Sequence, residues 1–202
     1  MPSKLLFLSG ASGNTEFWRP VAGLIDHPSE KVFIGWPGIG ATPAEDGVTG
    51  IQDFVSRTVA QIDQPTALVA QSMGGVIAIL AARQRPQLVT HIILTALSGG
   101  IETGDLGVSD WRPPKQEMTA ELEYAFASYS DNLEAELKQI KAKTLLIWGA
   151  SDPVSPVAVG KRVASLCQHS ELHVIPGGTH TFANTHAALV APLINEHLSR
   201  AA

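Results

Sequence analysis

The chain has 202 residues, of which 45% are hydrophobic and 16% charged, the composition of one ordinary globular domain. Its net charge of -5 and the lack of a Lys/Arg run argue against nucleic acid or an anionic membrane surface as the main partner. The single cysteine excludes an internal disulfide framework, and no apolar run is long enough for a secretory signal or a membrane span, so we expect a cytoplasmic protein.

Six short apolar segments along the chain predict β-strands, and five segments with helical spacing accompany them. The predicted strands are 4–9, 31–36, 66–71, 91–97, 143–149 and 171–177, and the predicted helices are 17–26, 50–62, 74–84, 156–167 and 184–200. Continuous apolar runs without strict alternation are typical of strands covered on both faces. The order of these segments therefore predicts a three-layer α/β/α fold with about six parallel strands.

Residues 98–142 interrupt the alternation of strand and helix. A loop rich in Gly, Pro and Asp is followed by two helical segments, 118–129 and 131–140, and the spacing of Asp131 and Glu134 fits a capping box at the start of the second. The insertion is too short for an independent fold. We therefore expect one domain, 1–202, with a short cap at 98–142.

Three residues with complementary chemistry follow three of the predicted strands. Ser72 follows the third strand, Asp152 the fifth and His180 the sixth. Ligands of open α/β sheets bind beyond the carboxyl ends of the strands, so these side chains are expected at one edge. A serine hydroxyl becomes a useful nucleophile when a base takes its proton and a third group orients that base. Ser, His and Asp supply this set.

The residues around Ser72 favour a sharp strand-to-helix turn. Ala70 and Gly74 lie two positions on either side of Ser72, and Gly75 follows. Small residues at these positions let the strand and the helix approach each other around a nucleophile. An ordinary serine at a strand end is the competing interpretation, and the two potential partners favour the nucleophile.

With these motifs the sequence resembles the α/β-hydrolases over nearly its whole length. The nucleophile motif G-x-S-x-G of that family corresponds to 70–74, AQSMG, with Ala70 in place of the first glycine. The acid loop corresponds to 148–156, WGASDPVSP, and the histidine loop to 176–182, PGGTHTF. The loop after the first strand, 8–20, has Ser9 where the family usually has His, and 35–42, GWPGIGAT, has Trp36 in place of an acid.

The resemblance implies roles for individual residues. Ser72 would be the nucleophile, His180 the general base and then acid, and Asp152 the group that orients the imidazole. The oxyanion hole would be the backbone N–H of Met73 with that of Ala11 or Ser12. The chain begins at what would be the third strand of the family's sheet, so we expect the fold without its first two strands.

Four aromatic residues are candidates for binding substrate: Trp36, Trp111, Tyr124 and Phe126. Packing of the cap onto the body explains the last three equally well. No Cys/His/carboxylate cluster has metal-ligand spacing, and 10–14, GASGN, lacks the context of a dinucleotide loop, so we expect neither a metal nor a cofactor.

Three functions are compatible with this pattern. The leading hypothesis is a serine hydrolase that cleaves a small to medium carboxylic ester or thioester through an acyl-enzyme. A C–C bond hydrolase or an elimination-type lyase would use the same triad, often with an arginine or a second polar group to hold a charged substrate, and Arg19, Arg112 and Lys115 are the available cations. A non-catalytic small-molecule binding protein of the same fold is the third. In each case we expect a small-molecule partner and a monomer or homodimer.

Overall fold

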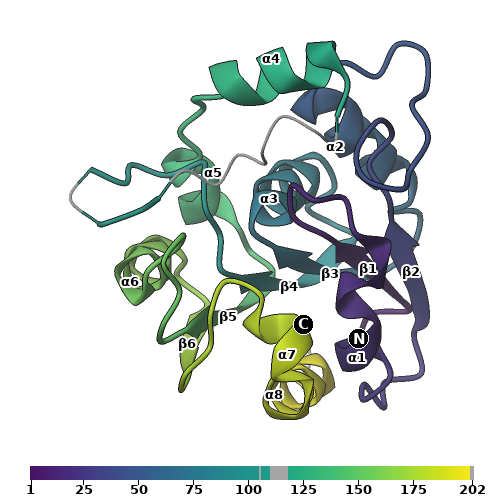
Figure 1. Cartoon of the computed structure of the whole chain (residues 1–202). Helices are drawn as coiled ribbons and strands as arrows, with labels where there is room; N and C mark the ends of the chain where they lie inside the picture. The colour runs from purple at the N-terminus through teal and green to yellow at the C-terminus, as the bar shows by residue number, and fades with distance from the viewer. Residues whose placement is uncertain (105, 110–117, 201–202) are drawn as a thin grey trace.

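A computed structural model of the chain describes residues 1–104, 106–109 and 118–200 and shows a six-stranded sheet between layers of helices (Figure 1). The strands are β1 (Lys4–Leu8), β2 (Glu30–Ile34), β3 (Thr66–Gln71), β4 (Val89–Thr95), β5 (Lys143–Gly149) and β6 (Ser170–Ile175). They are arranged in the order β2-β1-β3-β4-β5-β6, and every neighbouring pair is parallel. The predicted fold class is confirmed, and each strand begins and ends within two residues of its predicted range.

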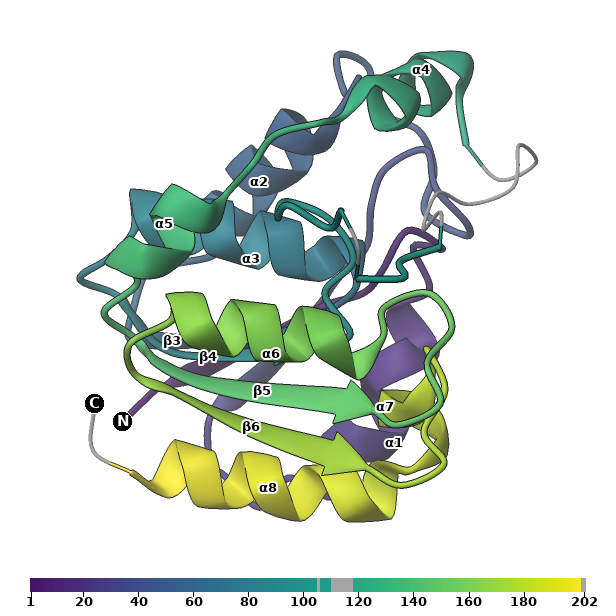
Figure 2. The same cartoon turned by 90° about the vertical axis from the view of Figure 1, so that its left-hand side faces the viewer.

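Helices cover both faces of this sheet (Figures 1 and 2). The helices are the 3-10 helix η1 (Thr15–Trp18), α1 (Arg19–Ala22), α2 (Ile51–Ala60), α3 (Met73–Gln84), α4 (Ala120–Ser128), α5 (Glu134–Gln139), α6 (Val157–Leu166), α7 (Phe182–Thr185) and α8 (Ala187–Ser199). Figure 2 shows α8 below β5 and β6, with α6 and α3 above the sheet. None of the helices in the described part of the chain is long and apolar enough to span a membrane.

Alternation along the central strands explains their continuous apolar sequences. In β1, Leu6 and Leu8 pack into the hydrophobic cluster on the side of α2, α3 and α6, whereas Leu5 and Phe7 pack into the cluster on the side of α1 and α8. Successive side chains of a strand point to opposite faces, so a strand that is covered on both faces needs apolar residues at every position.

Two predicted helices are shorter or interrupted in the structure. The segment predicted at 17–26 forms η1 and the four-residue α1, and the Lys31 ammonium group donates to the Ala22 and Ile25 carbonyl oxygens at 2.9 and 2.7 Å beyond its end. The segment predicted at 184–200 is divided into α7 and α8 at His186, whose φ and ψ of -116° and 35° lie outside the helical range.

The predicted capping box at Asp131 is wrong. The helix begins later, at Glu134, with Leu133 as the N-cap residue. Leu133 is buried, and its N–H donates to the Gly100 carbonyl oxygen at 2.6 Å, while the side chain of Asn132 accepts from the Glu134 N–H at 2.9 Å. The burial of Leu133 therefore determines where α5 starts. The spacing of Asp131 and Glu134 in the sequence gives no information about that burial.

Candidate active site

Ser72 occupies a strained turn between β3 and α3. Its φ of 54° and ψ of -122° lie in a region that residues other than glycine rarely adopt. The backbone of β1 passes close by, since a Cβ atom added at Gly74 would lie 2.6 Å from both the Leu8 and the Ser9 carbonyl oxygens. The glycine is therefore required by close packing of backbone against backbone, as expected for a nucleophile held at the tip of such a turn.

The structure brings Ser72, His180 and Asp152 into one hydrogen-bonded chain. Ser72 Oγ lies 3.1 Å from His180 Nε2, and His180 Nδ1 lies 2.9 and 3.1 Å from the two carboxylate oxygens of Asp152. A carboxylate accepts hydrogen bonds only, so Nδ1 carries the ring proton and Nε2 of the neutral ring is an acceptor. The Ser72 hydroxyl therefore donates to Nε2, which is the arrangement that a general base needs.

The loop after β5 fixes the carboxylate of Asp152. The side chain is fully buried, and its Oδ1 accepts from the backbone N–H groups of Val154 and Ser155 at 2.9 and 3.0 Å. The Ser155 hydroxyl in turn donates to the Leu97 carbonyl oxygen at 2.6 Å, and the Trp148 indole N–H donates to Ser155 Oγ at 3.1 Å. The acid is thus tied to β4 and β5, which leaves its other oxygen directed at the imidazole.

Gln71 holds the main chain of the histidine loop. Its side-chain amide donates to the His180 carbonyl oxygen at 3.3 Å, and Gln71 itself is buried directly before the serine. The same loop is joined to the end of β5, where the Ser151 N–H donates to the Gly178 carbonyl oxygen at 2.8 Å. Gln71 was not predicted as a site residue from the sequence. Its position directly before Ser72 in the nucleophile motif could have identified it.

A second hydroxyl group also contacts the serine. Ser98 Oγ lies 2.7 Å from Ser72 Oγ, and the Ser98 residue is fully buried. Ser98 lies just beyond β4, at the edge of the sheet where Ser72, Asp152 and His180 are found. The sequence analysis missed this residue. Its position after a central strand was a usable signal, but only the folded backbone shows that the two hydroxyl groups meet.

The two loops proposed for an oxyanion hole lie beside the turn. Met73 is the first residue of α3, where backbone N–H groups have no partner within the helix. The loop after β1 is a tight turn in which the Gly13 N–H donates to the Gly10 carbonyl oxygen at 3.0 Å. Within the described ranges, the N–H groups of Met73, Ala11 and Ser12 have no backbone acceptor.

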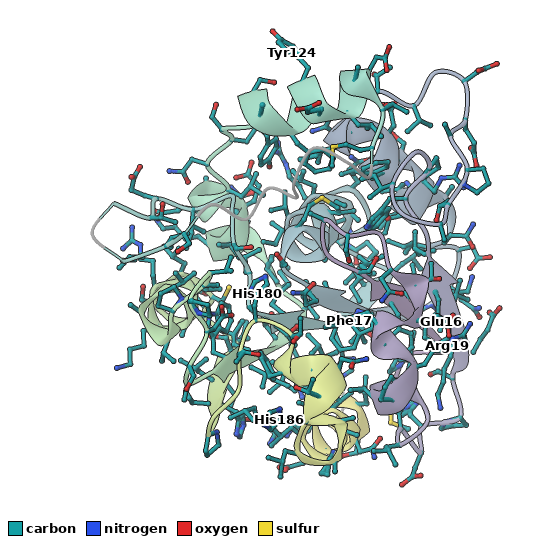
Figure 3. All side chains as sticks on the ribbon, viewed as in Figure 1. Glu16, Phe17, Arg19, Tyr124, His180 and His186 are labelled. Carbon is teal, nitrogen blue, oxygen red and sulfur yellow. The ribbon has the colours of Figure 1, made fainter. Side chains whose placement is uncertain are left out.

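Of the three aromatic candidates that the structure describes, two are buried in the core and one is exposed. Trp36 is fully buried, donates to the Ser9 carbonyl oxygen at 3.1 Å and stacks on Phe54, and Phe126 packs against the same Phe54 ring at 6.2 Å. Tyr124 is 76% exposed and points outward from α4 (Figure 3). Phe126 faces the core from that helix, and a residue two positions away faces the opposite side. Trp111 lies outside the described residues.

A pocket of about 370 Å³ lies among residues of the inserted segment, and its lining reaches Ser98 but contains none of Ser72, Asp152 and His180. Its lining includes Ser98, Thr103, Ser109, Tyr129 and Asp131. The Tyr129 hydroxyl is buried without a hydrogen-bond partner in the described part of the chain, and burial, together with the charges of Asp131 and Glu136, raises its pKa above the usual value. No group of three His, Cys, Asp or Glu side chains among the described residues is arranged to hold a metal ion.

Comparisons with known proteins show the family to which the chain belongs. Residues 5–131 match the model of the alpha/beta hydrolase family. The chain is 25% identical to a protein of Variovorax paradoxus (strain S110) named "Putative carbamate hydrolase RutD", over 97% of this chain and 91% of that protein. It is 26% identical to the pimeloyl-[acyl-carrier protein] methyl ester esterase of Aliivibrio salmonicida (strain LFI1238), over 71% of this chain and 59% of the relative.

A solved structure shows how closely the fold is shared. The N-acyl homoserine lactone degrading enzyme Est816 superimposes with a TM-score of 0.81 at 20% sequence identity, covering 97% of this chain and 93% of that one. The match spans nearly all of both chains, so it includes the sheet and the helices on both of its faces.

Proposed function

The chain belongs to the alpha/beta hydrolase family, and on that premise we propose that it cleaves small to medium carboxylic esters or thioesters through an acyl-enzyme on Ser72. The observation that carries this proposal is the hydrogen-bonded chain from Ser72 Oγ through His180 to Asp152. The strained turn at Ser72 and the unpartnered N–H groups beside it support the same reading.

The geometry gives each residue a step in the reaction. Ser72 Oγ attacks the carbonyl carbon while its proton passes to His180 Nε2, and the Asp152 carboxylate stabilises the imidazolium that forms. The N–H groups of Met73 and of Ala11 or Ser12 donate to the oxyanion. His180 then gives its proton to the departing alcohol or thiol, and a water molecule, deprotonated by His180, releases the acid from Ser72.

The names of the relatives support a small carbonyl substrate. One relative is named as a methyl ester esterase and another as a carbamate hydrolase, and both names describe attack on a carbonyl carbon next to a heteroatom. A carbamate is therefore a further substrate to test.

The alternative chemistries have little support in the described residues. A C–C bond hydrolase or lyase often needs an arginine or a second polar group to hold a charged substrate. The Arg19 side chain pairs with Glu16 at 3.2 Å and lies over the Phe33 ring. Arg112 and Lys115 lie outside the described residues. A binding protein without turnover would not need the strained Ser72 or a buried carboxylate behind His180.

A panel of aryl esters tests the proposal. Wild-type protein is assayed with p-nitrophenyl esters of increasing chain length, an aryl thioester and an aryl carbamate, beside Ser72→Ala and His180→Ala. We expect turnover of the short esters and a loss of roughly 10⁴-fold or more in both variants, because triad members act as a unit. The matched controls are Ser29→Ala and His169→Ala, which lie at the opposite edge of the sheet and should keep wild-type rates.

Two results would count against the proposal. Wild-type rates in Ser72→Ala would remove the serine from the reaction. A properly folded wild-type protein that turns over no member of the panel would favour the binding protein or the C–C chemistry.

A further inference from the structure

Ser98 contributes the shortest polar contact to the proposed nucleophile. Its hydroxyl oxygen lies 2.7 Å from Ser72 Oγ, closer than the 3.1 Å from Ser72 Oγ to His180 Nε2. Ser98 is fully buried, and Ser72 Oγ is the one hydrogen-bond partner of its side chain within the ranges that the structure describes. The Ser98 side chain is therefore held in the protein interior with its hydrogen bond directed to the proposed nucleophile.

The direction of this hydrogen bond follows from the triad. Asp152 accepts a hydrogen bond from the Nδ1–H group of His180, so Nε2 of the neutral ring accepts a hydrogen bond from the Ser72 hydroxyl. Ser72 has no second proton to give, and Ser98 is then the donor in the contact between the two hydroxyl groups. The chain runs from Ser98 to Ser72 to His180 to Asp152, each group donating to the next.

We propose that Ser98 is a further catalytic residue, whose hydroxyl group stabilises Ser72 Oγ as the leaving group of deacylation; this rests on the function proposed above. In the acyl-enzyme, Ser72 Oγ is the single-bonded oxygen of an ester, which is a weak acceptor because its lone pair is shared with the carbonyl group. As the bond from the acyl carbon to Oγ breaks, the electron pair moves to Oγ and the hydrogen bond from Ser98 strengthens.

Deacylation needs only the acyl-enzyme and one water molecule, and all bonds and protons in the step are accounted for. Water adds its oxygen to the acyl carbon and loses one proton to His180 Nε2. The bond between that carbon and Ser72 Oγ then breaks, its electron pair goes to Oγ, and the proton on Nε2 is transferred to the same oxygen. Ser98 keeps its own proton throughout and acts only as a donor.

The two half-reactions depend on Ser98 to different extents. Acylation starts from a free Ser72 hydroxyl that already accepts from Ser98, so removing the donor affects the ground state and the transition state similarly. Deacylation starts from an ester oxygen that accepts weakly, so the donor favours the transition state over the ground state. Only an interaction that is stronger in the transition state accelerates a step.

Ser98→Ala tests this difference with a p-nitrophenyl ester whose deacylation limits turnover. We expect kcat to fall about three- to tenfold, the range that one net hydrogen bond supplies, while kcat/KM stays within about twofold of wild type. At substrate concentrations below KM, the fraction of acyl-enzyme found by intact mass in the steady state should rise. Burst amplitude counts the folded active sites, so a loss of folded protein is separated from a slower step.

Ser98→Thr keeps the hydroxyl group and should restore most of kcat, whereas Ser29→Ala, another buried serine, should change neither constant. Equal losses in kcat and kcat/KM, or no change in either, would overturn the role of Ser98. If the wild-type protein itself forms no acyl adduct on Ser72, both this inference and the proposed function are wrong. A wild-type adduct with unchanged Ser98→Ala kinetics would overturn only the inference.

Discussion

Asp152 is placed so that it accepts hydrogen bonds from three directions. It accepts hydrogen bonds from His180 Nδ1–H and from the backbone N–H groups of Val154 and Ser155. A carboxylate suits this position because it has no proton to donate. The orientation of the imidazole, and with it the basic nitrogen that faces Ser72, depends on that property.

Asp152→Asn is expected to lower kcat about 10⁴-fold with little change in fold. The amide has nearly the same shape, but its NH₂ group donates to Nδ1 and places the ring proton on Nε2, which then cannot accept from Ser72. Steady-state kinetics at neutral pH measure the loss. Asp46→Asn, at an exposed position, is the matched control. A variant that retains a tenth of the wild-type kcat would contradict the role of the acid.

Gly74→Ala is expected to destabilise the protein and to lower its activity. The added methyl group would meet the Leu8 and Ser9 carbonyl oxygens at 2.6 Å, and these backbone atoms cannot move without displacing the loop that follows β1. Thermal unfolding followed by circular dichroism reports the stability. Gly23→Ala is the control, because its nearest neighbour would lie at 3.4 Å and its φ of -68° is ordinary, so it should leave Tm unchanged or slightly higher.

The site residues differed in how far the sequence revealed them. The meeting of Ser72, Asp152 and His180 was predictable, because each follows a recognisable strand and their chemistry is complementary. Ser98 and Gln71 were not, because a hydroxyl-to-hydroxyl contact and a side chain that holds a neighbouring loop depend on distances between strands. Tyr124 was proposed for the site as an aromatic residue of the insertion. It lies on the face of α4 that is exposed to solvent.

At the scale of elements, two histidines join α8 to the start of the central strands. His91 of β4 and His197 of α8 are buried, and their rings meet edge to face with centroids 5.1 Å apart. His197 Nε2 lies 3.2 Å from the Lys143 carbonyl oxygen, and His91 Nε2 lies 3.1 Å from that of Arg200. Burial lowers the pKa of both rings, that of His197 to about 4.

This pair predicts a loss of stability in mild acid. The unfolded chain takes up protons on these rings below about pH 6.5, whereas folded His197 stays neutral until about pH 4, so the free energy of unfolding falls as the pH decreases between these values. The contribution of His197 is on the order of 3 kcal/mol.

Urea unfolding at pH 7, 6, 5 and 4 measures the slope of stability against pH, and His197→Phe should have a shallower slope than wild type. His186→Phe, at a half-buried position between α7 and α8, is the control and should keep the wild-type slope. Equal slopes in wild type and His197→Phe would contradict the assignment.

Element boundaries were predicted well where packing and local sequence agree. Strands with apolar residues at every position were located within two residues, because burial on both faces leaves a clear pattern. The break at His186 and the late start of α5 at Glu134 were not predicted. Tertiary contacts set the backbone conformation of His186 and the burial of Leu133, and neither is visible in the local sequence.

For the whole molecule, one sheet separates two hydrophobic clusters. Trp36 and Trp148 belong to the cluster beneath α2, α3 and α6, and Trp18 belongs to the cluster beneath α1 and α8. Every central strand contributes side chains to both clusters, so neither can be lost while the other persists. We therefore propose that the chain, including the insertion at 98–142, unfolds as a single domain.

Urea unfolding followed by two signals tests this proposal. Far-ultraviolet circular dichroism and tryptophan fluorescence should give the same midpoint and a single transition. Two separated transitions, or a fluorescence change that precedes the loss of secondary structure, would show that the two layers or the insertion unfold independently.

Labelling with a fluorophosphonate tests most directly whether Ser72 is the nucleophile. The tryptic peptide 58–83 contains Ser72, and the peptide that begins at Gln84 contains Ser98, so mass spectrometry distinguishes the two neighbouring hydroxyl groups. The account predicts one adduct per chain, on Ser72, that appears together with the loss of esterase activity and is absent from Ser72→Ala. An adduct on Ser98, or full loss of activity without an adduct on peptide 58–83, would contradict it.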